Sequence, residues 1–167
     1  MALPARFGPL AILCGLLWAV LAWIGTMEPV YYSPASVVDY ASVASFSAGL
    51  ITLAACVWDL RLSSRAVAVG GAAAAVGLFI AGVANLIEDG FGVGAFGIAY
   101  VGGILVGTLA LIPTGVGLAL GKGTRWIALG PLISFLGLIF VAQWWGAAIL
   151  ATTWMALGAL RSLSRLR

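Results

Sequence analysis

Histidine is absent from this sequence of 167 residues. Its absence removes the commonest ligand of zinc and copper sites, the usual haem ligand, and the base of Ser–His and Cys–His nucleophile pairs. Cysteine is scarce too: Cys14 and Cys56 stand far apart in apolar runs and form no C-x-x-C motif. We expect two buried, unpaired thiols, with a redox or metal role as the alternative. The inventory therefore predicts no cofactor and no bound metal.

Charge is the second scarcity. Only 8% of the residues are charged and 63% are hydrophobic, and the mean hydropathy is +1.18. Soluble domains carry charge on about 25% of their residues and are about half apolar. So few polar side chains cannot cover a core of this size, which excludes a water-soluble fold. The net charge of +3 comes without a basic patch interleaved with aromatic residues, so no nucleic-acid partner is expected.

Apolar runs fill most of the chain. Prolines, glycines and short polar turns divide it into segments of about the 20 residues that a membrane span needs. We expect Ser33 to cap the second span with Pro34 at its first helical position, and Pro113 either to end or to kink the fourth span. The prediction is an all-α membrane bundle over residues 1–167 with no soluble domain. Its expected spans are residues 9–27, 34–58, 65–89, 93–120, 126–143 and 145–160.

The number of spans depends on the uncharged segment from Trp126 to Leu160. As one helix it would be about 52 Å long, far more than a hydrocarbon core of about 30 Å. Two spans joined near Gln143 would each be about 25–27 Å long. We therefore expect six spans, with five as the alternative.

The placement of charge favours six spans. With both termini on one side, all eight basic residues lie at that side and the acidic residues lie at the other, except Asp59. Because basic residues are retained in the cytoplasm, both termini are predicted to be cytoplasmic in a multi-pass protein of the cell (inner or plasma) membrane. Five spans would place the three C-terminal arginines outside.

Tryptophan placement agrees with this arrangement. Trp18 and Trp154 lie deep within their spans and are expected to pack rather than to bind a ligand. The others lie near span ends as interface anchors: Trp23, Trp144 and Trp145 on the outer side, Trp58 and Trp126 on the inner side.

Glycine is abundant, with 23 residues. Gly103-x-x-x-Gly107, together with Gly70 and Gly71, allows helix backbones to approach closely. Those faces either contact a partner chain or pack among the protein's own helices. Residues 92–97 match G-x-G-x-x-G as a string, but no strand precedes it and no acidic residue follows at the required distance, so we expect no dinucleotide site.

The acidic outer side is the one feature that resembles a site. Carboxylates near the C-terminal ends of spans one and three oppose the helix dipole by about 0.3–1 kcal/mol each. They either form the mouth of a pocket for a cation, an amine or a polar headgroup, or lie solvated at the rim. The candidate ligand-binding residues are Glu28, Asp39, Asn85, Glu88 and Asp89.

The sequence offers no catalytic set, and neither Asp39 nor Asp89 has the surroundings of an intramembrane aspartyl protease. We therefore expect a non-enzymatic protein, a structural or accessory subunit that packs with other membrane subunits through its Gly/Ala faces. The alternative is a small transporter or capture subunit that uses the acidic mouth. The bundle is similar in size to the six-span substrate-capture subunits of vitamin importers, which is a resemblance of architecture only.

Overall fold

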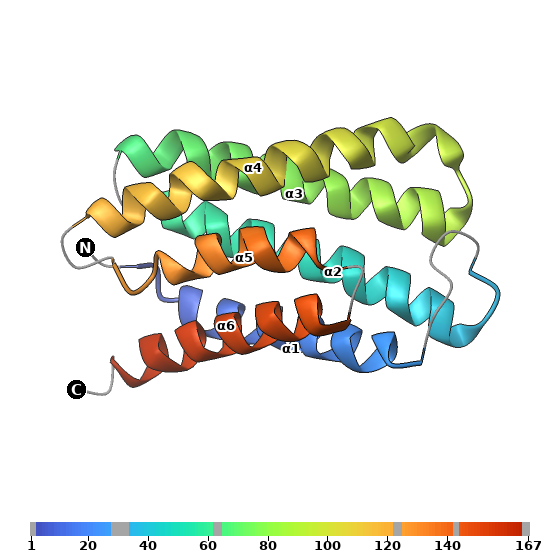
Figure 1. Cartoon of the computed structure of the whole chain (residues 1–167), viewed down its shortest axis with the longest axis horizontal. Coiled ribbons are helices and arrows are strands. Elements are labelled where there is room, and N and C mark those ends of the chain that lie inside the picture. The colour runs from blue at the N-terminus through green and yellow to red at the C-terminus, as the bar shows by residue number, and fades with distance from the viewer. Residues whose placement is uncertain (1–2, 28–33, 62–64, 122–124, 142–143, 165–167) are drawn as a thin grey trace.

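The computed structural model describes residues 3–27, 34–61, 65–121, 125–141 and 144–164, with side chains not described at 65 and 66 (Figure 1). These residues form helices and no strand, which confirms the predicted all-α class. Five of the helices are long and apolar enough to cross a membrane. The elements are α1 (Phe7–Gly25), α2 (Val37–Leu60), α3 (Arg65–Phe91), η2 (Gly94–Phe96), α4 (Gly97–Leu120), α5 (Leu129–Ile139) and α6 (Trp144–Leu163).

The helices form a closed ring. Each of the six α-helices packs against the next one along the chain, and α6 packs against α1. Figure 1 shows the ring flattened into two layers, with α1, α2 and α3 in one layer and α6, α5 and α4 in the other. The interior is filled by large side chains with no exposed surface, among them Trp18, Leu50, Leu53, Leu78, Leu111, Leu150 and Trp154.

The ring has two chemically distinct ends. Arg6 precedes α1, Arg61 follows α2, Arg125 precedes α5 and Arg161 lies in the last turn of α6, which places these cations at one end, the basic end. Asp39, Glu88 and Asp89 lie at the other, the acidic end. Arg161 donates a hydrogen bond of 2.9 Å to the Leu3 carbonyl oxygen, so both described ends of the chain meet at the basic end. Both six passes of the chain and five helices of spanning length are therefore present in the described residues, so the choice between six and five membrane spans stays a prediction.

The boundaries of α2 and α4 differ in detail from those predicted. The cap of α2 is Ser36 rather than Ser33, and the helix begins at Val37. The fourth helix runs on through Pro113 to Leu120. It begins later than expected, at Gly97, because a turn at Gly92 with φ of 71° and a 3₁₀ turn precede it.

The fifth helix is much shorter than predicted. The segment from Trp126 to Leu160 does form two helices, but α5 spans only Leu129–Ile139. At 11 residues it is about 16 Å long, about half of a hydrocarbon core. Turns at residues 125–128 and 140–141 take up the rest of the described part of that segment.

Because α5 is short, part of α4 has no neighbour on one side in the described part of the chain. Gly115 of α4 lies against Leu132 of α5. Because these helices run in opposite directions, the last residue of α5, Ile139, is level with about Thr108 of α4. The part of α4 nearer the acidic end therefore extends past α5. In the most apolar stretch of that span only 17% of the residues are buried, against 50–56% in α1, α2 and α3.

Candidate functional site

The residues proposed as an acidic mouth lie on two helices and make different contacts where the structure describes them. Glu28 lies outside the described residues. Asp39 belongs to the first turn of α2, and Asn85, Glu88 and Asp89 lie in the last two turns of α3. The role of each is set by what its side chain contacts, and the contacts differ.

Asp39 is part of the N-terminal cap of α2. Its Oδ2 accepts hydrogen bonds from the backbone N–H groups of Ser36 (2.9 Å) and Ala35 (3.1 Å). The Ser36 hydroxyl oxygen accepts in return from the Asp39 N–H at 3.1 Å, which completes a capping box. A carboxylate in the first turn also interacts favourably with the helix dipole. Asp39 is 7% exposed, so its contacts indicate a structural role.

The capping box gives a prediction about stability. We expect Ser36→Ala to lower the free energy of unfolding by about 1 kcal/mol, because the N–H of Asp39 loses its acceptor. The control is Ser45→Ala, the same change in the middle of α2. Chemical unfolding in detergent, followed by circular dichroism, measures the difference. Equal effects of the two substitutions would contradict the assignment of this cap.

Asn85 joins two helices inside the bundle. Its amide Nδ2 donates a hydrogen bond of 3.0 Å to the hydroxyl oxygen of Ser47 on α2, and both residues are buried. A buried polar group in a membrane bundle needs such a partner. Asn85 thus ties α2 to α3 rather than facing the outer surface.

Glu88 and Asp89 are the two candidate residues that remain partly exposed. A Cβ added at Gly97 would lie 2.6 Å from Oε1 of Glu88, so this carboxylate rests on the first turn of α4. The positive end of the α4 dipole is there and stabilises it. This contact offsets the unfavourable position of Glu88 at the C-terminal end of α3. The sequence alone could not reveal the contact. Among the described residues, no group of three or more His, Cys, Asp or Glu could hold a metal ion.

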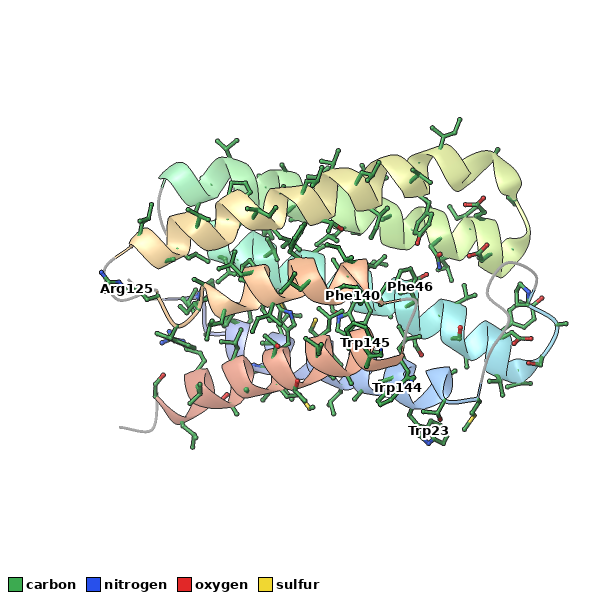
Figure 2. The ribbon with its side chains drawn as sticks, in the orientation of Figure 1. Trp23, Phe46, Arg125, Phe140, Trp144 and Trp145 are labelled. Atoms are coloured by element: carbon green, nitrogen blue, oxygen red, sulfur yellow. The ribbon has the colours of Figure 1, made fainter. Side chains whose placement is uncertain are left out.

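Aromatic side chains gather between the middle of the bundle and its acidic end (Figure 2). Figure 2 shows Trp144, Trp145 and Phe140 where α5 gives way to α6, with Trp23 beside them on α1. The rings of Phe140 and Trp145 lie 4.7 Å apart, and Trp144 packs on Gly25 of α1. The sequence predicts Trp23, Trp144 and Trp145 at the outer interface, where such rings anchor a membrane protein. Figure 2 shows Trp145 nearer the middle of the bundle than Trp23.

A second series of aromatic contacts crosses the ring of helices, and the sequence did not predict it. Phe46 of α2 meets Trp18 of α1 at 6.0 Å and Tyr100 of α4 at 6.5 Å, both edge to face. Edge-to-face pairs at these distances add to the energy of burial. Nothing in the spacing of these three residues signals the contact, because they come from three different helices.

At the basic end, the buried carboxylate of Asp59 forms an ion pair with Arg6. The carboxylate is 1% exposed, and its Oδ1 lies 2.6 Å from Nη2 of the arginine, with Nε of Arg6 donating to both carboxylate oxygens. This pairing raises the pKa of Arg6 through the hydrogen bond and the charge of Asp59. A guanidinium is protonated at any pH below its pKa. Because the pKa of Arg6 is raised, the arginine stays charged throughout the physiological pH range. Asp59, the acid that lies among the cations, therefore links α2 to the N-terminal segment through this ion pair.

The glycines singled out in the sequence face other helices of the same chain. A Cβ added at Gly103 would lie 2.8 Å from the backbone N of Ala81, and one at Gly107 would lie 2.7 Å from that of Leu78, both on α3. Gly70 faces Thr114 on α4, and Gly71 faces Arg61 at the end of α2. The expected close helix packing therefore occurs inside the bundle at these four positions: Gly70, Gly71, Gly103 and Gly107.

The chain matches no model of a known protein family, no curated protein and no solved structure. Its architecture is that of a helical bundle with five helices of spanning length and apolarity. Together with the scarcity of charge, this makes the chain a multi-pass integral membrane protein.

Proposed function

We propose that this protein is a non-enzymatic subunit of a larger membrane assembly and that it docks a transmembrane helix of a partner on α4. The observation that carries the proposal is the shortness of α5, which ends level with about Thr108. Among the described residues, the outer turns of α4 have no neighbour on that side. The internal glycine faces do not support it, because α3, α4 and the end of α2 already occupy them.

The exposed surface of α4 at this level has the pattern of a helix-packing face. Ile98, Val101, Gly102 and Leu105 follow the i, i+3, i+4, i+7 spacing of one helix stripe, the α4 strip. Ile98 is 89% exposed, and a Cβ added at Gly102 would meet nothing within 4 Å. A small residue between larger apolar ones lets a second helix approach closely within a membrane.

Cysteine crosslinking in native membranes tests this proposal. Gly102→Cys places a thiol in the α4 strip, and Val116→Cys places one on the same helix level with α5. We expect Gly102→Cys to give a crosslinked product of higher mass and Val116→Cys to give several times less. The mass of the product tells whether the partner is a second copy or a different protein. A monomer in mild detergent together with no product from Gly102→Cys would contradict the proposal.

A second candidate function rests on Glu88 and Asp89. Neighbouring carboxylates in the last turn of α3 are partly exposed, and no cation among the described residues forms an ion pair with them. Such a pair suits a cationic or amine-bearing substrate that enters from the acidic end. The test is thermal stabilisation of the purified protein by a panel of amines and inorganic cations. Stabilisation that Glu88→Gln with Asp89→Asn removes supports transport or capture, and no stabilisation of the unaltered protein rules it out.

A further inference from the structure

An apolar crevice opens on the outer surface between α2 and α3. Its volume is about 400 Å³, within the range of ligand-binding pockets. Three of its side chains, Trp58, Val76 and Phe79, are themselves 38–53% exposed, so the crevice faces the surroundings of the bundle rather than its interior. The lining residues are all apolar: Ile51, Ala54, Ala55, Trp58, Ala75, Val76 and Phe79.

The crevice lies in the half of the bundle nearer the basic end. Along α2 it extends from Trp58, two residues before the end of that helix, back to Ile51. That is a length of about 10 Å, which fits within one leaflet of a hydrocarbon core about 30 Å thick. The alanines of both helices form its floor, since their small side chains leave the space between the larger residues empty.

A cation stands at the basic end of this crevice. The guanidinium carbon of Arg61 lies 3.6 Å from the centre of the Trp58 ring, and Trp58 lines the crevice. The Nε of Arg61 is buried and has no hydrogen-bond acceptor among the described residues. The nearby carboxylate of Asp59 is already engaged by Arg6. Arg61 therefore brings a positive charge to the edge of the crevice, where the guanidinium stacks on the ring of Trp58.

We propose that this crevice binds one acyl chain of an anionic phospholipid and that Arg61 binds the phosphate of the same lipid. An entirely apolar lining fits a hydrocarbon chain and offers nothing to a polar ligand. The cation at the end where lipid headgroups lie supplies the complementary charge, and basic sites between transmembrane helices recognise anionic headgroups in this way. Arginine, with its fork of donors, suits phosphate oxygens.

Lipid binding by the full-length protein in detergent, measured by native mass spectrometry, tests the inference. The probes are phosphatidylglycerol, phosphatidylcholine with the same acyl chains, and glycerol 3-phosphate. We expect about fivefold tighter binding of phosphatidylglycerol, the factor for one cation near an anionic headgroup. Arg61→Gln should abolish that preference. The control, Arg125→Gln, removes an exposed cation at the same end of the bundle and should keep it.

A second variant tests the acyl-chain part independently of charge. Ala55→Leu fills the crevice and should weaken the binding of both phospholipids while the preference for the anionic one persists. The inference is overturned if Arg61→Gln retains the preference, if Arg125→Gln loses it to the same extent, or if Ala55→Leu binds both lipids as the unaltered protein does. Binding of glycerol 3-phosphate as tight as that of the lipid would also overturn it, because the chain would then contribute nothing.

Discussion

Gly103→Leu should prevent stable packing of α3 against α4, whereas Gly102→Leu, one residue away, should leave the bundle folded. A Cβ added at Gly103 would lie 2.8 Å from the backbone N of Ala81 and from the carbonyl oxygen of Gly77. Backbone atoms cannot rotate aside, so the helices must separate. Overpacking of a core costs about 1–3 kcal/mol and sometimes more, and we expect a loss of at least about 3 kcal/mol.

Unfolding of the purified protein in a detergent mixture, followed by tryptophan fluorescence, measures this loss. Gly102→Leu is the matched control, because it makes the same chemical change on the same helix where nothing lies within 4 Å. It should change the free energy of unfolding by less than about 0.5 kcal/mol, as substitutions away from packed positions do. The same control variant bears on the proposed function, since it should weaken partner docking on the α4 strip without unfolding the bundle. Similar losses for Gly102→Leu and Gly103→Leu would mean that α3 and α4 do not cross as described.

Trp154→Ala should destabilise the protein by about 3 kcal/mol. The side chain has no exposed surface, meets the ring of Phe7 edge to face at 6.3 Å and packs on Gly130 of α5. It therefore holds α6 against α1 and α5 at once. Truncation of a buried tryptophan costs about 3–5 kcal/mol in soluble proteins. We expect the lower value because the solvent of a separated helix is lipid, not water, so the cavity and the lost contacts dominate.

Two further variants separate packing from hydrogen bonding at this position. The indole N–H of Trp154 donates to the hydroxyl oxygen of Ser134 at 2.8 Å, so Trp154→Phe should cost about 1 kcal/mol through the lost bond and the smaller ring. Trp23→Ala, the same truncation at a 64% exposed tryptophan, should have little effect on thermal stability. If Trp23→Ala and Trp154→Ala lower the melting temperature equally, the buried position of Trp154 is wrong.

The structure changes which surface we propose for a partner. The sequence predicts that Gly103 and Gly107 pack either against another chain or against the protein's own helices. In the structure they lie against α3. The α4 strip is an apolar surface that stays exposed beside the early end of α5. The proposed assembly role therefore rests on the length of a different helix from the one that carries the glycine motif.

Asp39 is a candidate site residue for which the structure shows a capping role that the sequence did not predict. A carboxylate near a span end fits both a ligand site and a helix cap, because the same charge serves either. The choice depends on where α2 begins, and the sequence placed that start at Ser33 and Pro34. The capping box at Ser36 moves the start three residues later and makes Asp39 its third helical residue.

Composition and the order of apolar segments were enough to determine the helical membrane class of this protein and the separation of its basic and acidic ends. Hydropathy and charge belong to each segment wherever it packs. The helical class, the cations at one end and the acids other than Asp59 at the opposite end therefore follow from the sequence alone. Tertiary contacts decided the rest. Gly102 and Gly103 are chemically identical neighbours whose side-chain directions differ by about 100° around the helix. Only the position of α3 makes one of them a tight internal contact and leaves the other open, because a helix carries no mark of which neighbour will cover each face.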